Sequence, residues 1–330
     1  MSDDQPRILI TGGAGFVGSN LVAELQRRQP EARLLVIDDM RSGSFANLCT
    51  HESKPFAYRG HVIAQSLNDL KLYETVENFD PQVIFHLASI TDTTVTDEAK
   101  MIADNVEPFE DLLDVSVELG IKLVWVSSAA TYGQHANGAT QAQRPFALDD
   151  AGVPANVYGF SKWVMENAAR NMLAEHPEAH IVGLRYFNVF GPGEQFKKHM
   201  ASMVYQLAMQ MLDGKRPRIF APGTQARDQV YVKDVVDCTL AAADDRVKSG
   251  VYNVGSGVAT SFNDIVAALN AALGTSLEPD YFENPYAFYQ DYTCADMTAT
   301  AKGLRWKPRW KPADAIAEYA QLLKATHRPR

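Results

Sequence analysis

Short apolar runs alternate with helix-patterned segments over the first half of the chain. The apolar runs predict strands at residues 8–10, 33–37, 56–63, 82–88, 121–126 and 181–186. The segments between them predict helices at residues 19–25, 67–79, 97–119 and from 156 onward. This alternation is typical of a doubly wound parallel sheet, the Rossmann type of α/β fold, which binds ligands at the carboxyl ends of its strands.

The pattern changes near residue 188, after which short strands and helices are separated by many turns. We therefore expect a Rossmann domain, with its ligand site at the carboxyl ends of the strands, over residues 1–187 and a smaller C-terminal α/β lobe over residues 188–330. Two strand-like runs within residues 228–256 are expected to return to the first domain.

Composition and charge narrow the class of protein. The 330 residues are 46% hydrophobic and 22% charged, which is ordinary for a globular protein. The formal net charge of −9 comes without a long basic run, so we expect no nucleic-acid partner. No apolar stretch approaches the ~20 residues that span a bilayer, and the N-terminus lacks the features of a signal peptide. Three scattered cysteines form neither a disulfide framework nor a metal-ligand spacing. We therefore expect a cytoplasmic protein with no membrane partner and no metal.

A glycine-rich turn joins the first predicted strand to the first helix. Gly12 permits the tight turn, Gly15 lets backbone N–H groups approach a pyrophosphate, and Gly18 lets the helix pack close to the strand. The second strand ends in Asp38, 20 residues beyond Gly18, where an acidic side chain accepts the ribose hydroxyls of an adenine dinucleotide and repels a 2′-phosphate. The pattern predicts an NAD site.

Tyr158 and Lys162 are four residues apart in a predicted helix and therefore lie on one face of it. A tyrosine with a pKa near ~10 is a poor base at neutral pH, but a neighbouring ammonium and a nicotinium ring favour the phenolate. Ser128, at the end of a neighbouring strand, is placed to hold a substrate hydroxyl against the phenol. These residues predict proton transfer coupled to hydride transfer.

With these motifs, the chain resembles the extended short-chain dehydrogenase/reductase family from residue 8 to about residue 306. The matching runs are residues 127–133, 156–162 and 185–192, which many sugar-nucleotide epimerases share, and residues 197–202 and 289–298, which point to the heptose 6-epimerases. The resemblance implies epimerisation by transient oxidation to a ketone. It also implies a homo-oligomer that associates through the helices at 97–119 and 156–175.

The resemblance assigns three sets of residues. The catalytic set is Tyr158, Lys162 and Ser128, with Lys197 as a second acid/base group. The cofactor set lines the nucleotide cleft and consists of Gly12, Gly15, Phe16, Val17, Gly18, Asp38, Asp39, Leu87, Ala88, Asn105, Ser127, Tyr158, Lys162 and Phe187. The substrate set faces the nucleotide-diphosphate sugar and consists of Thr94, Ser128, Asn188, Lys197, His199, Phe220, Arg227 and Tyr289.

Some positions depart from the family. Gly60, His61 and Val62 stand where an Asp usually binds the adenine amino group. The heptose enzymes favour NADP and use a lysine where this chain has Phe45. NADP stays an alternative to NAD, because Arg41 could meet a 2′-phosphate.

Three other functions are alternatives to this one. One is a hexose-nucleotide 4-epimerase of the UDP-glucose type. Another is a non-catalytic NAD-binding scaffold, which the presence of the Tyr-Lys pair disfavours. A 4,6-dehydratase is disfavoured because no carboxylate follows Ser128 in the run to Tyr132.

Overall fold

The computed structural model describes residues 5–136, 143–285 and 291–328. Its centre is a seven-stranded sheet in which all neighbouring strands are parallel. In order across the sheet the strands are β12 (Gly250–Val254), β8 (Ile181–Tyr186), β7 (Lys122–Ser128), β6 (Val83–His86), β1 (Arg7–Thr11), β2 (Arg33–Ile37) and β5 (His61–Ile63). The chain runs outward from β1 in one direction and then from β6 in the other. The predicted doubly wound Rossmann fold is confirmed.

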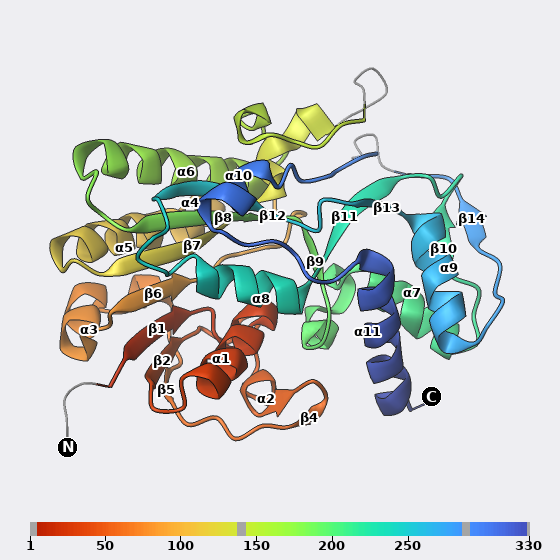
Figure 1. Ribbon diagram of the computed structural model, residues 1–330, viewed down its shortest axis with the longest axis horizontal. Helices are drawn as coiled ribbons and strands as arrows, with labels where there is room; N and C mark the ends of the chain where they lie inside the picture. Colours follow the sequence, from red (N-terminus) through yellow and green to blue (C-terminus); the bar gives the residue numbers. More distant parts are fainter. Residues whose placement is uncertain (1–4, 137–142, 286–290, 329–330) are drawn as a thin grey trace.

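Helices cover both faces of this sheet (Figure 1). One face carries α1 (Phe16–Arg28) and α8 (Val232–Ala241). The other carries α3 (Leu72–Phe79), α4 (Glu98–Asn105), α5 (Glu107–Glu118) and α6 (Val157–Glu175). Because both faces are covered, the inner strands are largely buried, which explains their nearly continuous apolar sequences: all six residues of β8 are buried.

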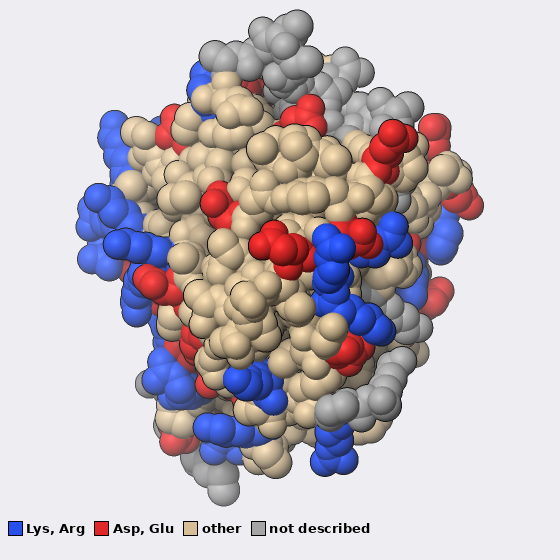
Figure 2. Space-filling view, turned by 90° about the vertical axis from the view of Figure 1, so that its right-hand side faces the viewer, with Lys and Arg blue, Asp and Glu red and all other residues tan. Residues whose placement is uncertain are grey.

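The second half of the chain builds smaller units beside the sheet. A three-stranded sheet has the order β13 (Ala259–Ser261), β11 (Ala226–Tyr231) and β9 (Asn188–Phe190). A two-stranded sheet pairs β10 (Arg218–Phe220) with β14 (Asp280–Phe282). Besides α8, the α-helices of this half are α7 (Met203–Leu212), α9 (Phe262–Leu273), α10 (Thr298–Gly303) and α11 (Pro312–Thr326). Figure 2, which faces this side, shows acidic and basic side chains interspersed around a broad uncharged surface.

Of the two strand-like runs expected to return to the central sheet, one does so. β12 pairs with β8 at the edge of that sheet, whereas β11 pairs with β9 and β13 outside it. Within the described residues, no helix is long and apolar enough to cross a membrane.

The single helix predicted over residues 97–119 is wrong, because the structure has two helices there. α4 ends at Asn105 and α5 begins at Glu107. Pro108 is the physical reason: it has no N–H to bond to the carbonyl of Asp104, and its ring clashes with that carbonyl. A similar break separates the 3₁₀ helix η1 (Leu67–Asp69) from α3, where one helix was predicted over 67–79.

The strand predicted over residues 56–63 is much shorter in the structure. Only His61–Ile63 pairs with β2. The preceding segment is held by the Gln26 side chain of α1, which donates to the carbonyl of Ala57 (2.9 Å) and accepts from the N–H of Arg59 (3.0 Å). A short β3–β4 hairpin (Thr50–His51 and Lys54–Pro55) and α2 (Phe45–Leu48) precede it.

Candidate active site

The glycine turn lies between β1 and α1, and two of its glycines are required by close packing. A Cβ on Gly12, whose φ is +69°, would lie 2.6 Å from the Ala88 nitrogen. A Cβ on Gly18 would lie 2.1 Å from the Gly12 oxygen. α1 has no side-chain cap and no acidic residue in its first turn, so its free N–H groups and positive dipole are available to an anion. The turn therefore fits a dinucleotide pyrophosphate.

Asp38 ties this turn to the loop that follows β2. Its carboxylate accepts hydrogen bonds from the N–H groups of Ala14 and Met40, both at 2.9 Å. Burial raises the pKa of Asp38, and these hydrogen bonds oppose the rise. The carboxylate lies at the carboxyl edge of the sheet, as a ligand for the adenosine ribose requires. Asp39 is exposed next to it.

Leu87 and Ala88 follow β6 and are held against β1. The N–H of Leu87 donates to the carbonyl of Thr11 (3.0 Å), and that of Ala88 donates to the Thr11 hydroxyl (3.3 Å). The same hydroxyl lies 2.8 Å from Nδ1 of His86. His86 is buried, and burial lowers its pKa to about 3, so its ring is neutral at physiological pH. His86 was not predicted as a site residue, although a polar residue inside an apolar strand is a usable signal.

Asn105 was predicted to bind the cofactor, but its side-chain amide forms hydrogen bonds to other groups of the protein. It accepts from the N–H of Ile90 (2.7 Å) and donates to the carbonyl of Ile90 (3.1 Å) and the hydroxyl of Ser161 (3.1 Å). Asn105 therefore fixes the loop after β6 relative to α6. In this geometry it shapes the cleft.

Tyr158 and Lys162 lie in the first turns of α6, which is capped by Asn156 through a 2.7 Å hydrogen bond from the N–H of Gly159. Both side chains are buried. Nζ of Lys162 donates to the carbonyl of Val126 (2.9 Å), and burial lowers the pKa of Lys162 to about 7. Burial raises the pKa of Tyr158, and a hydrogen bond with Ser128 opposes the rise. The structure thus brings the predicted catalytic trio together at the carboxyl end of β7.

Ser127, one residue earlier, points into a buried ionic network. Its hydroxyl donates to Glu166 (2.7 Å), and Glu166 accepts two hydrogen bonds from Arg185 at 2.7 and 2.6 Å. Arg185 continues to the hydroxyl of Tyr132 (3.0 Å), which donates to Asn253 of β12 (2.7 Å). This network was not predicted from the sequence. Two signals for it were available: Glu166 follows Lys162 by four residues in the predicted helix, and the apolar strand at 181–186 contains the charged residue Arg185.

The predicted substrate residues lie on several segments. Thr94 donates to Asp92 (2.6 Å), and Nε2 of His199 lies 4.0 Å from the same carboxylate, so these two segments meet. Phe187 is buried against the ring of Tyr132, whereas Asn188, the next residue, is exposed.

Lys197 lies in the 3₁₀ helix η4 (Glu194–Met200), with Nζ 5.6 Å from the ring centroid of Phe16. It is half-buried, and burial lowers its pKa, against the opposing effect of the Glu194 carboxylate. Its contact is thus with the start of α1, beside the glycine turn. No hydrogen bond in the described part of the chain joins Lys197 to Tyr158.

The remaining predicted substrate residues lie farther along the chain. Arg227 is buried in β11 and donates to the carbonyl of Ala226 (3.0 Å). Phe220, in β10, packs on Phe282 with ring centroids 4.8 Å apart. Tyr289 lies outside the described residues.

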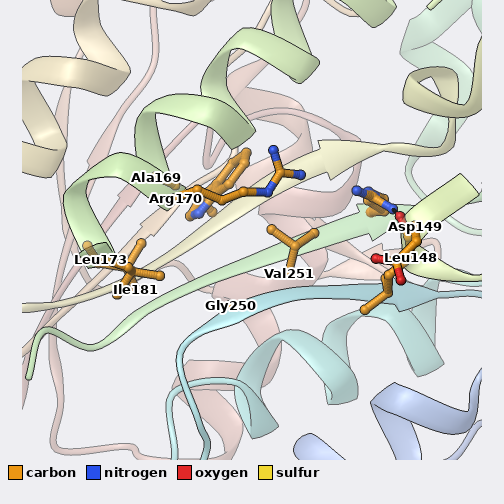
Figure 3. A pocket seen from close by; sticks show the side chains of 10 residues that line it. Leu148, Asp149, Ala169, Arg170, Leu173, Ile181, Gly250 and Val251 are labelled. Atoms are coloured by element: carbon orange, nitrogen blue, oxygen red, sulfur yellow. Dashed lines mark hydrogen bonds between the residues drawn. The ribbon is translucent and has the colours of Figure 1, made fainter. Parts of the chain in front are cut away.

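One pocket of about 240 Å³ lies elsewhere and contains none of the predicted site residues. Figure 3 shows its lining side chains on α6, β8 and β12, with the apolar residues Leu173, Ile181 and Val251 below Arg170. Both of its guanidinium groups, those of Arg170 and Arg185, are bound to Glu166. We therefore place the candidate active site at the glycine turn and Tyr158, not in this pocket. Among the residues with defined placement, no three His, Cys, Asp or Glu side chains are grouped as a metal site.

This geometry, a dinucleotide turn beside a buried Tyr-Lys pair and a serine hydrogen-bonded to the tyrosine, is typical of a nicotinamide-dependent enzyme. A family model described as "NAD dependent epimerase/dehydratase family" matches residues 8–255. The chain is 32% identical over 324 residues to the ADP-L-glycero-D-manno-heptose-6-epimerase of Brachyspira hyodysenteriae, covering 96% of this chain and 98% of the relative. It belongs to the NAD-dependent epimerase/dehydratase family.

Two solved structures agree with this assignment. The ADP-L-glycero-D-manno-heptose-6-epimerase of Helicobacter pylori is 35% identical, with a TM-score of 0.84 and coverage of 98% of this chain and 99% of that one. The UDP-glucose 4-epimerase of Thermotoga maritima is 26% identical, with a TM-score of 0.84 and coverage of 97% and 99%. The resemblance to nucleotide-sugar epimerases of the short-chain dehydrogenase/reductase type is confirmed.

Proposed function

We propose that this chain is an NAD-dependent nucleotide-sugar epimerase whose substrate is an ADP-heptose inverted at C6. The observation that carries the proposal is the buried pair of Tyr158 and Lys162, with Ser128 hydrogen-bonded to Tyr158, beside a glycine turn that fits a dinucleotide. Identity of 32% and 35% to two heptose 6-epimerases over nearly the whole chain favours the heptose among sugars.

The first proton transfer belongs to Tyr158. As the phenolate it removes the proton from the hydroxyl of the carbon to be inverted, and the acid/base group on the opposite face gives a proton to the oxygen when the carbon is reduced again. Bound NAD would supply the hydride chemistry, as acceptor of a hydride from that carbon and as donor to the opposite face of the transient ketone. No atom is lost or gained overall, so the product is the epimer.

Lys162 supports Tyr158 in two ways. Its ammonium favours the phenolate electrostatically, and its N–H groups beyond the one bound to Val126 are available to the nicotinamide ribose. Because burial lowers the pKa of Lys162 to about 7, part of the lysine population is neutral at neutral pH. We infer that a positively charged cofactor ring supplies the rest of the stabilisation of the phenolate. Ser128 hydrogen-bonds to Tyr158 and is proposed to hold the substrate hydroxyl beside it.

The C-terminal lobe is proposed to bind the nucleotide-diphosphate sugar. Arg227 suits the diphosphate, because a guanidinium binds it with two parallel hydrogen bonds. Asn188 is exposed at the start of β9 and available to a ligand. Lys197 is proposed as a second acid/base group for the opposite face of the ketone, and its lowered pKa supports that role.

The test is proton NMR of the purified protein with ADP-D-glycero-D-manno-heptose and, separately, UDP-glucose, without added cofactor. Appearance of the L-glycero epimer supports the proposal, and Lys197→Met should then reduce the rate. Conversion of UDP-glucose alone would assign the enzyme to C4 and remove the proposed role of Lys197. The 4-epimerase is the second candidate because its Thermotoga maritima relative has the same TM-score as the heptose enzyme.

We further propose a division of labour in which residues 1–187 and β12 bind NAD while residues 188–330 bind mainly the sugar nucleotide. The cysteines support a cytoplasmic location, since Cys49, Cys238 and Cys294 are all free thiols. A homo-oligomer through α4–α5 and α6 is proposed from the family resemblance.

A further inference from the structure

Arg41 is the cation closest in sequence to the ribose-binding Asp38. It follows Asp38 by three residues on the loop after β2, where a cation in this fold can bind the 2′-phosphate of NADP. Its sequence position alone therefore leaves the choice between NAD and NADP open. The contacts of its guanidinium decide what it is free to bind.

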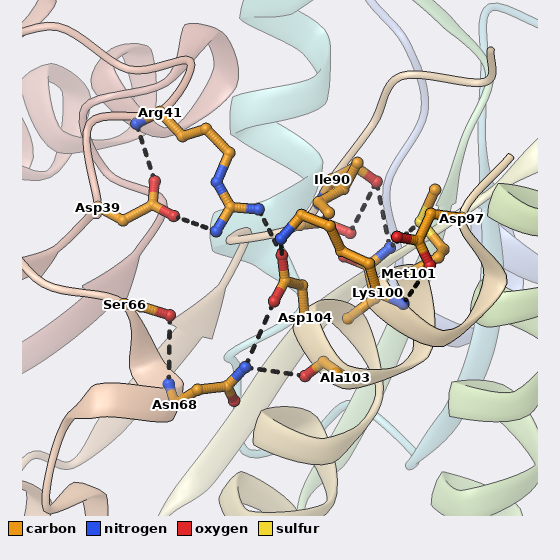
Figure 4. A network of polar contacts seen from close by, with 12 residues as sticks. Asp39, Arg41, Ser66, Asn68, Ile90, Asp97, Lys100, Met101, Ala103 and Asp104 are labelled. Atoms are coloured by element: carbon orange, nitrogen blue, oxygen red, sulfur yellow. Dashed lines mark hydrogen bonds and ion pairs between the residues drawn. The ribbon is translucent and has the colours of Figure 1, made fainter. Parts of the chain in front are cut away.

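The guanidinium is engaged by two carboxylates from different segments (Figure 4). Arg41 lies 2.8 Å from Asp39 on its own loop and 2.5 Å from Asp104 on α4. The backbone N–H of Arg41 also donates to Asp39 (2.9 Å). The side chain thus reaches from the loop after β2 across to the helix that follows β6.

Asp104 is held in place by its surroundings. Nζ of Lys100, one turn earlier on α4, donates to it at 2.8 Å. Asn68 of η1 donates to the carbonyl of Ala103 (2.9 Å) and approaches Asp104 at 3.5 Å. The next residue, Asn105, is fixed to the loop after β6. The segments after β2, β5 and β6 therefore meet at this carboxylate, which is only 14% exposed.

The charges in this cluster cancel. Arg41 and Lys100 face Asp39 and Asp104, while Asp38 adds a further carboxylate beside them. A 2′-phosphate, with a charge of about −2, would meet Asp38 and would have to draw Arg41 away from two partners. A ribose hydroxyl needs no cation and leaves the cluster intact.

We propose that Asp104 is a positioning residue for cofactor choice: by holding Arg41 against α4, it withholds the cation that a 2′-phosphate requires and so favours NAD over NADP. The inference rests on the dinucleotide site of the proposed function and not on the sugar that the enzyme converts.

The test is a competition experiment on the full-length protein. Wild type and variants are stripped of nucleotide, equilibrated with an equimolar mixture of NAD and NADP, and separated by gel filtration, and the bound nucleotides are quantified after acid release. For Asp104→Asn we expect the ratio of bound NADP to NAD to rise about fivefold, the upper range for one half-exposed ion pair. Asp104→Glu, which keeps the carboxylate, should restore a ratio near that of the wild type.

Two controls distinguish the positioning of Arg41 by Asp104 from an effect of net charge or of a general structural change. Asp114→Asn on α5 makes the same change in net charge at an exposed site that lacks a described ion pair, and it should leave the ratio unchanged. In an Arg41→Met background, Asp104→Asn should no longer alter the ratio, because no guanidinium is released.

An unchanged ratio in Asp104→Asn, or an equal rise in Asp114→Asn or in the Arg41→Met background, overturns the proposal. Binding is measured without sugar, so failure of the heptose reaction would leave this result interpretable. Wild-type protein that binds neither nucleotide would refute both.

Discussion

Burial of the Lys162 ammonium in the candidate site lowers the free energy of unfolding. Its ammonium is buried, and its only described hydrogen bond is to the carbonyl of Val126. Burial lowers its pKa from 10.5 to about 7. Between these values the unfolded chain binds more protons than the folded protein, so this lysine makes the free energy of unfolding rise with pH over that window.

Lys162→Met should therefore stabilise the nucleotide-free protein at pH 7 by on the order of 2–4 kcal/mol while abolishing turnover. Urea unfolding at pH 7 and at pH 9 measures the effect: the advantage of the variant over wild type should shrink at the higher pH. A variant that is less stable than wild type at both pH values would mean that the ammonium is compensated in the folded protein.

Tyr158 provides the complementary prediction, on activity alone. Tyr158→Phe removes only the phenolic oxygen, so folding and NAD content should be retained while kcat falls about 10²–10⁴-fold, the usual contribution of a positioned acid/base group. Steady-state kinetics with the substrate identified by NMR, together with release of bound nucleotide, gives both readouts. Activity within a few-fold of wild type would assign the base to another residue.

At the scale of elements, the sequence predicted the positions of strands and helices better than their breaks. The strand over residues 181–186 and the helix from residue 156 were found because their apolar spacing is regular. The break at Val106 depends on Pro108, and the shortness of β5 depends on the Gln26 side chain of another element. The Gln26 contact is tertiary, so the sequence around residues 56–63 gives no sign of it.

The proximity of the three proposed catalytic residues was predictable from local pattern, since Tyr158 and Lys162 share a helix face and Ser128 ends a strand. The Glu166–Arg185 pair was not predicted, because its partners come together only when α6 packs on β8. It anchors the helix that carries Tyr158 to the strand beside Ser128.

Arg185→Met should destabilise the protein by up to about 3 kcal/mol, because it removes two hydrogen bonds from the buried Glu166 carboxylate and leaves it only Arg170 and Ser127 as partners. Replacing both residues, with Glu166→Gln added, should recover part of the loss, which a double-mutant cycle in urea unfolding measures. Exposed Arg246→Met, which breaks only a surface pair with Asp244, is the matched control and should change stability by less than about 1 kcal/mol. Additive losses in the cycle would contradict the coupling.

At the scale of the whole molecule, the outer surface of α5 is part of the face through which a homo-oligomer is predicted to form. This face exposes five carboxylates, those of Glu107, Glu110, Asp111, Asp114 and Glu118. Among the described residues, no Lys or Arg forms an ion pair with any of them. α6, beside it, exposes Phe160 at 49%. An interface made from these two helices would combine apolar contact with repulsion between the acidic faces.

We therefore expect self-association through α5 and α6 to strengthen with salt. Sedimentation velocity in low-salt buffer and in about 1 M NaCl, where the screening length falls to about 3 Å, should give a larger assembled fraction at high salt. Asp111→Asn combined with Asp114→Asn should raise association at low salt and flatten this dependence, because it removes part of the repulsion. Glu31→Gln combined with Glu283→Gln, at two exposed sites outside α5, makes the same change in net charge and is the control. Association that weakens with salt, or that ignores the α5 substitutions, would locate the interface on another face of the molecule.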